Sequence, residues 1–135
     1  MKEVSSAEFA SIAARILDDK KAQDIKVLNI SNISVLADYF VICSSESSTH
    51  IKALTGYVRD KIKNLFSRIP IGEENDAKNR WNLLDYGDVV VHILHKDERE
   101  TYAIERFWSH AFCMSEEEWK EKSKEYTDYN DNALN

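Results

Sequence analysis

One continuous apolar run, Tyr39–Cys43, constrains the fold of this chain more than any other feature. A strand with one face in water alternates apolar and polar residues, so an unbroken apolar run predicts a strand that is covered on both faces. Two stretches with apolar residues at three- and four-residue spacing, 9–17 and 51–65, predict amphipathic helices. The sequence therefore predicts a β-sheet with helices packed on it.

The remaining elements follow from local patterns. β-branched and apolar residues predict further strands over 25–30, 81–85 and 88–95, the last two joined in a hairpin by a tight turn at Tyr86-Gly87. Ser115 and Glu118 form a capping box, which predicts a polar C-terminal helix. We expect a polar connection over 70–80 and a turn over 97–100. The segment 101–108 is expected to be a strand end or a short helix, and the last nine residues are expected to be disordered.

This order is helix, strand, strand, helix, strand, strand, helix, and it predicts an α+β fold with one mixed β-sheet. The 135 residues suit one domain, and only three glycines and one proline exclude collagenous and linker-rich classes. We place the folded domain over 1–110 and an acidic helix and tail over 111–135. Cys43 and Cys113 are far apart in the sequence and have no metal-ligand spacing, so we expect no disulfide framework or zinc site.

The charge balance limits the partners. The net charge of −6 argues against a protein that holds nucleic acid through its phosphates. If the chain meets a nucleoprotein particle, we expect it to contact a basic protein there. The chain has no apolar leader at its start and no run long enough to span a membrane, so we expect a cytoplasmic protein without membrane contact.

We find no catalytic constellation, and we expect no cofactor, no metal and no enzyme activity. Asp85 and Asp88 flank the hairpin turn and could hold a divalent cation, but the loop 44–48 has no glycine to cradle a phosphate. Both aspartates are expected to cap the turn or face a partner. His92 and His95 lie three apart on a strand and point to opposite faces, and Cys43 is expected to be an inert core thiol.

Aromatic residues gather in sequence around the hairpin and its exit: Trp81, Tyr86, Tyr102 and Trp108. Large aromatics beside charged residues such as Asp85, Asp88 and Arg99 are the usual composition of a protein-binding hot spot. Core packing explains the same residues equally well.

Three segments carry a resemblance to a known family. Asp24-Ile25, then the segment 36–44 (Leu-Ala-Asp-Tyr-Phe-Val-Ile-Cys-Ser), then the segment 81–92 (Trp-Asn-Leu-Leu-Asp-Tyr-Gly-Asp-Val-Val-Val-His) resemble the ribosomal silencing factor family, RsfS, also called Iojap. The similarity runs from about Phe9 to Trp108. One departure is Glu74-Asn75, where the family has Glu-Gly, and we expect Asn75 to tolerate a left-handed backbone there.

The resemblance implies a non-catalytic repressor that binds the L-fourteen protein of the large ribosomal subunit and blocks association with the small subunit when nutrients are scarce. It also implies a nucleotidyltransferase-like sheet without active-site motifs, and a homodimer when the protein is free. On the matching segment and beside it, it places the binding role on Trp81, Asp85, Tyr86, Asp88, Arg99 and Tyr102. Two alternatives remain: an assembly factor for the large subunit that uses the same contact, and a nucleotidyl or phosphoryl transferase that uses Asp85 and Asp88.

Overall fold

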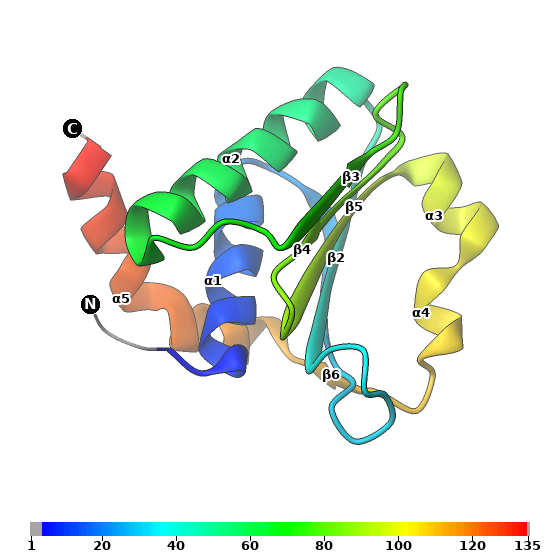
Figure 1. The fold of residues 1–135 in the computed structure, drawn as a ribbon, viewed down its shortest axis with the longest axis horizontal. Coiled ribbons are helices and arrows are strands. Elements are labelled where there is room, and N and C mark those ends of the chain that lie inside the picture. The colour runs from blue at the N-terminus through cyan, green and yellow to red at the C-terminus, as the bar shows by residue number, and fades with distance from the viewer. Residues whose placement is uncertain (1–3, 135) are drawn as a thin grey trace.

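Helices cover both faces of a single β-sheet, and they cover them unequally (Figure 1). The computed structural model describes residues 4–134, and describes side chains for 4–104, 106 and 108–126. One face of the sheet carries the three long helices α1 (Ser6–Asp19), α2 (Ser48–Phe66) and α5 (Glu116–Leu134). The opposite face carries only the short helices α3 (Lys96–Tyr102) and α4 (Ile104–Phe107), so part of it stays open.

The sheet has six strands in the order β3-β4-β5-β2-β1-β6. Their bounds are β1 Gln23–Asn29, β2 Tyr39–Ser45, β3 Gly72–Asn75, β4 Trp81–Asp85, β5 Val89–His95 and β6 Phe112–Met114. β2 and β5 pair in parallel, and the other neighbours pair antiparallel, including the β4–β5 hairpin. The predicted α+β fold with one mixed sheet is confirmed, and the apolar run at 39–43 is a central strand, buried on both sides.

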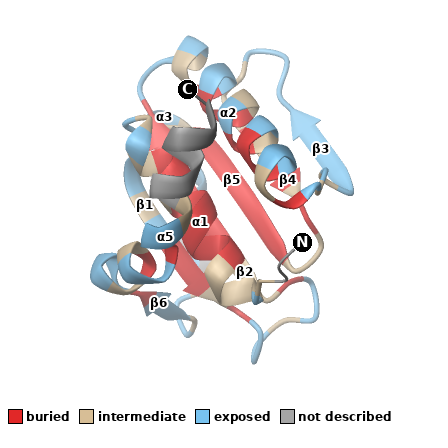
Figure 2. Ribbon diagram, turned by 90° about the vertical axis from the view of Figure 1, so that its left-hand side faces the viewer, coloured by how far each residue is buried: buried red, intermediate tan, exposed pale blue. Residues whose placement is uncertain are grey.

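Capped helices and a two-sided core explain why these segments fold as they do. The Ser5 hydroxyl accepts a hydrogen bond from the backbone N–H of Glu8 at the start of α1, and Ser47 does the same for His50 at the start of α2. The main core lies between the sheet and the long helices, and β5 is buried along almost its whole length (Figure 2). A smaller cluster that includes Phe40 lies on the opposite face.

Three elements differ from the sequence prediction. The polar connection contains β3, which has four exposed residues and forms by backbone pairing with β4 rather than by apolar burial. The turn at 97–100 is part of α3, whose N-cap is His95, and β6 adds a three-residue strand beside β1. Asn75 lies in β3 and is not left-handed; the left-handed residue of this region is Asn79, with φ 52°.

The C-terminal segment packs into the same core as the rest of the chain. Trp119 on α5 is 2% exposed within the main core, and the Arg15 guanidinium on α1 donates to Ser123 at 2.7 Å. The C-terminal segment after residue 110 therefore contributes side chains to the main core, and the division that we placed there stays a prediction. The last nine residues, for which the sequence predicts disorder, include the end of α5 up to Leu134, but their side chains and residue 135 lie outside the described part, so this expectation stays a prediction. No helix within 4–134 is long and apolar enough to cross a membrane.

Candidate protein-binding site on the open face of the sheet

Trp81 is the centre of the candidate site because of its place on β4. Side chains alternate along a strand, and here Asn82 and Leu84 are buried toward the helices while Trp81, Leu83 and Asp85 are only partly buried on the other face. The amide of Asn82 donates to Thr55 on α2 at 3.0 Å, which fixes the register of the strand against that helix. Because Asn82 is held toward the helices, its neighbours on β4, Trp81 and Leu83, point toward the open face.

Two ring contacts orient the Trp81 side chain. Its indole Nε1–H donates to Nδ1 of His92 on β5 at 3.3 Å, and its ring packs against Tyr102 of α3 with a centroid separation of 5.2 Å. Tyr102 is 54% exposed, so this aromatic pair reaches the protein surface. Preorganised aromatics bury large area at little entropic cost when a partner binds.

His92 is a neutral hydrogen-bond acceptor for Trp81. It is 5% exposed and packs edge-on against Phe40 at 4.7 Å. Burial lowers the pKa of His92 to about 4, and the nearby carboxylate of Asp85 raises it only in part. At neutral pH the imidazole therefore carries no charge and its Nδ1 can accept the indole proton.

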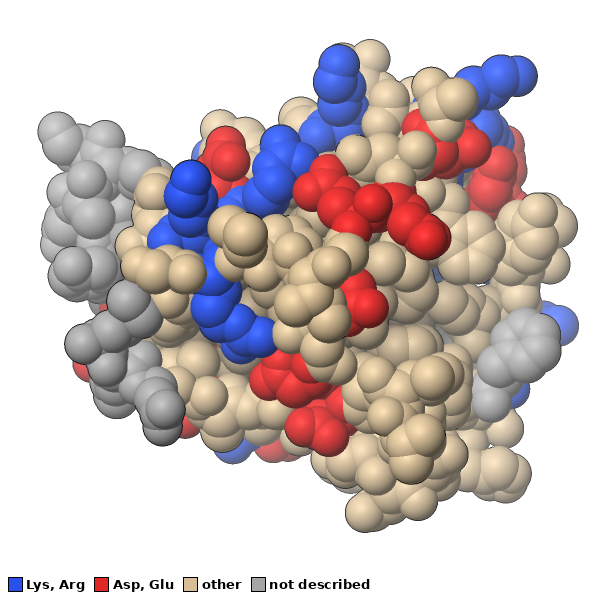
Figure 3. Space-filling view, viewed as in Figure 1, with Lys and Arg blue, Asp and Glu red and all other residues tan. Residues whose placement is uncertain are grey.

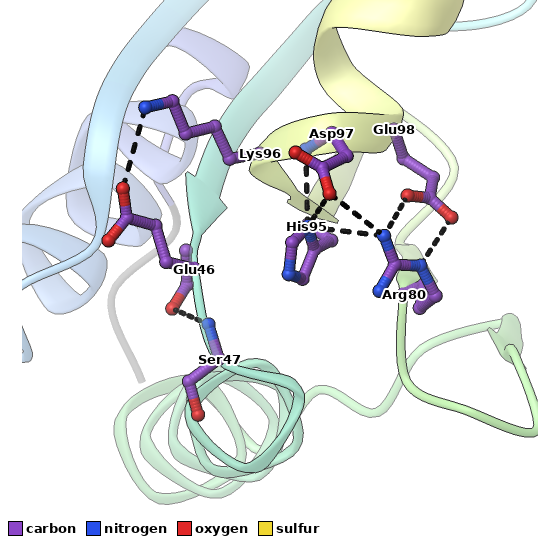
Figure 4. A network of polar contacts seen from close by, with 8 residues as sticks. Glu46, Ser47, Arg80, His95, Lys96, Asp97 and Glu98 are labelled. Atoms are coloured by element: carbon purple, nitrogen blue, oxygen red, sulfur yellow. Dashed lines mark hydrogen bonds and ion pairs between the residues drawn. The ribbon is translucent and has the colours of Figure 1, made fainter.

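A charged clamp fixes α3 beside β4 (Figure 4). The guanidinium of Arg80 donates two hydrogen bonds to Glu98, from Nε at 2.7 Å and from a terminal nitrogen at 2.6 Å, and these bonds lower the pKa of Glu98. The carbonyl of Arg80 also accepts a bond from the backbone N–H of His95 at 2.7 Å. The clamp ties the first turn of α3 to the residue before Trp81, so Tyr102 at the end of α3 lies against the indole.

An open groove of about 420 Å³ runs beside Trp81, lined also by Leu83, Glu74, Asn75 and Asp76. Its lining combines one aromatic and one aliphatic side chain with two carboxylates. The Asp76 carboxylate already accepts the backbone N–H groups of Lys78 and Arg80, which holds it in place. This combination fits a basic protein surface that also presents apolar area.

The structure does not bring the six predicted binding residues together. Trp81, Asp85 and Tyr102 lie on the open face, whereas Asp88 lies at the hairpin turn. The two remaining residues are buried: Tyr86 and Arg99, 3% and 8% exposed.

Each of these two buried side chains has its own packing role. Tyr86 turns to the helix side, where its ring meets Phe9 at 5.0 Å, and burial raises its pKa to about 12. Arg99 donates to the carbonyl of Asp24 and reaches Ser44. Trp108, also grouped with the hairpin aromatics by sequence, packs on Phe40 at 5.3 Å instead of on Trp81.

The two turn aspartates bind different protein groups. Asp85 accepts the backbone N–H of Gly87 at 2.8 Å, at a turn where Gly87 has φ +93°. Asp88 accepts from Arg68 at 2.9 Å and from Ser6 at 3.0 Å; burial raises its pKa, and these hydrogen bonds outweigh that and lower it. Within the described part of the chain, no group of three or more His, Cys, Asp or Glu side chains could hold a metal ion.

Sequence reasoning missed several residues of the site. Leu83 shares the face of Trp81, and the alternation along 81–85 was the signal for it. Glu74 and Asp76 reach the groove through β3 and the turn after it, which carry no apolar pattern. Arg80 and His92 join the site through contacts between neighbouring strands and helices, for which a single sequence gives no signal.

The sequence matches one protein family and several named relatives. The family described as "Ribosomal silencing factor during starvation" matches residues 3–134, which includes the C-terminal segment beyond residue 108. The chain is 42% identical over 108 residues to the ribosomal silencing factor RsfS of Bacillus subtilis, covering 80% of this chain and 91% of that one. It is 31% identical over 96 residues to the mouse protein named "Mitochondrial assembly of ribosomal large subunit protein 1", covering 70% of this chain and 42% of that one.

Two solved structures resemble this chain in both sequence and fold. A crystal structure of a Chromobacterium violaceum protein matches with a TM-score of 0.74 at 31% identity, covering 78% of this chain and 88% of that one. A Bacillus halodurans protein matches with a TM-score of 0.68 at 34% identity, covering 80% of this chain and 97% of that one. Sequence and fold together lead to one conclusion: the chain belongs to the ribosomal silencing factor family, RsfS.

Proposed function

We propose that this protein binds the L-fourteen protein of the large ribosomal subunit and sterically blocks association with the small subunit, which represses translation when nutrients are limited. Membership of the silencing-factor family supports the ribosomal role. The observation that carries the contact is the surface aromatic pair Trp81–Tyr102 beside an acidic groove. The protein acts by occupying a surface, as a cytoplasmic regulator and not as an enzyme.

The charges at the site favour a basic protein over RNA. Glu74 and Asp76 line the groove beside Trp81, and Asp85 lies at the other end of β4 on the same face; these carboxylates repel phosphate. Burying an aromatic anchor such as Trp81 in a partner contributes roughly 2–4 kcal/mol to binding. In this proposal Trp81, Asp85 and Tyr102 touch the partner.

The other three candidate residues support the site from behind. Tyr86 and Asp88 hold the hairpin turn against α1, through Phe9 and Ser6 respectively. Arg99 holds α3 against the ends of β1 and β2. The free protein is proposed to be a homodimer.

Sedimentation with separated ribosomal subunits tests the proposal. We expect the wild-type protein to pellet with the large subunit alone and to prevent the small subunit from joining it. Trp81→Ala is expected to lose roughly 30-fold or more in affinity, whereas Trp81→Phe, which keeps a ring against Tyr102, retains most of it. Pelleting of Trp81→Ala equal to wild type would contradict the site, and no pelleting of wild type with either subunit would contradict the function.

A second function, assembly of the large subunit, is favoured by the name of the mouse relative. It uses the same contact, so the two functions differ in when the protein acts. Assembly predicts that cells depleted of the protein accumulate incomplete large subunits during rapid growth. Silencing predicts normal large subunits in those cells and a failure to lower translation on starvation.

A further inference from the structure

The outer edge of the sheet at β3 is open. β3 is the terminal strand in the sheet order and pairs only with β4 among the described residues. All four of its residues are exposed, and it stands at the rim of the molecule (Figure 2). An edge strand presents backbone N–H and C=O groups on its free side, and an extended peptide can pair with them.

This edge is continuous with the groove beside Trp81. Glu74 and Asn75 belong to β3 and also line the groove. Glu74 pairs in register with Leu83 of β4, so its side chain lies on the same face as Leu83 and Trp81. A strand added along β3 would therefore place every second side chain on the face where Glu74 and Asp76 stand.

The charges of the β3 side chains indicate which peptide could pair with this edge. Glu73 points to the helix side, where Arg59 of α2 pairs with it at 2.8 Å, and Glu74 points to the groove side, for which the structure gives no ion pair among the described residues. Figure 3 shows acidic atoms gathered over the region of β3, bordered by basic atoms over α2. Opposite charges directly across a strand pair stabilise it and like charges destabilise it, so the added strand should carry Lys or Arg on the groove face.

The same charges disfavour two other occupants. A second copy of this chain paired edge to edge would set Glu73 and Glu74 against the same two glutamates. RNA has no strand backbone to pair with the edge, and its phosphates would meet Glu74 and Asp76.

We propose that β3 accepts an extended, Lys- or Arg-bearing segment of a basic protein as a seventh strand of the sheet, next to the Trp81 groove. The proposal rests on the proposed function for the identity of the partner, a ribosomal protein of the large subunit. Backbone pairing then provides the direction and register of docking, and the Trp81–Tyr102 pair provides the anchor.

Amide hydrogen exchange of the full chain, alone and with purified L-fourteen protein, tests the inference. We expect amides of 72–75 that face away from β4 to exchange at least roughly tenfold more slowly in the complex. Glu74→Lys is expected to weaken binding roughly tenfold or more, while the control Glu125→Lys makes the same charge change on the exposed surface of α5 and leaves binding unchanged.

Two proline variants add a backbone test, because neighbouring residues of a strand point their N–H groups to opposite sides. Of Glu73→Pro and Glu74→Pro, the variant that removes the outward N–H should keep the wild-type melting temperature and lose binding. If both variants unfold, the exchange experiment alone decides.

Each contrary outcome has a distinct meaning. Binding that depends on Trp81 but leaves the β3 amides unprotected and is insensitive to Glu74→Lys overturns the added strand and leaves the proposed function intact. Protection of β3 that rises with protein concentration in the absence of a partner assigns the edge to a second copy and overturns the inference. Absence of any binding overturns both the inference and the proposed function.

Discussion

The indole N–H of Trp81 on β4 donates to the Nδ1 of His92 on β5, at 3.3 Å, so a buried neutral histidine orients the central aromatic side chain of the candidate site. The bond needs the uncharged imidazole, because a protonated ring has no acceptor. Stability of the fold and orientation of the binding surface are therefore linked through one proton.

Protonation of His92 should make the stability of the fold depend on pH. The unfolded chain protonates His92 below its ordinary value of 6.5, whereas the folded protein resists protonation until about pH 4 because the ring is buried. The contribution of His92 to the free energy of unfolding should thus be complete above pH 6.5 and fall by about 2 kcal/mol between pH 6.5 and 5. Urea titrations of wild type and His92→Gln measure this; a slope that is identical in both proteins would refute the linkage.

The ionisation of Asp88 should add a second pH dependence of the free energy of unfolding, at lower pH than that of His92. Arg68 and Ser6 lower its pKa in the folded state, so its contribution is complete above its ordinary value of 3.8 and is lost as pH falls through the lowered value. Asp88→Asn should cost about 1 kcal/mol at pH 7, a modest figure because the side chains of Arg68 and Asp88 are 35% and 32% exposed. The gap between variant and wild type should close in acid, and a gap that persists at pH 2 would show that the charge is not its cause.

Variants of Tyr86 should show that this residue contributes to the stability of the core and not to binding of the partner. Its hydroxyl has no hydrogen-bond partner among the described residues, so Tyr86→Phe should change the free energy of unfolding by less than about 0.5 kcal/mol. Removing the ring in Tyr86→Ala should cost roughly 3–5 kcal/mol, since the ring fills the core against Phe9. Chemical denaturation measures both. Tyr86→Phe should also bind large subunits as wild type does, and a selective loss of binding would return this residue to the contact surface.

The two cysteines should differ in reactivity. Cys43 is fully buried in β2, and burial raises the pKa of its thiol to about 12, with Arg99 opposing only in part; Cys113 on β6 is exposed. Ellman's reagent at pH 8 should therefore modify one thiol in the folded protein and a second only after denaturation. Cys113→Ser is the control, and rapid labelling of that folded variant would mean that β2 opens far more readily than its position at the sheet centre implies.

Elements whose signals are local could be predicted from the sequence alone. The apolar run at 39–43 predicted a strand covered on both faces, Ser115 with Glu118 predicted the start of the C-terminal helix, and Gly87 predicted the hairpin turn, because each signal depends on neighbours within a few residues. β3 and β6 escaped prediction because both are short and mostly exposed, and they exist through pairing with β4 and β1.

Which side chains share a surface depends on how the sheet and helices pack, and could not be predicted from local patterns. Asp85 and Tyr86 are adjacent in the sequence, yet one lies partly buried at the open face and the other fills the helix-side core, because strand alternation separates them across the sheet. Trp81 and Tyr102 are far apart in the chain, yet their rings meet because Arg80 and Glu98 hold α3 beside β4. A binding surface is made of such long-range contacts, and these arise only when the sheet and α3 pack together.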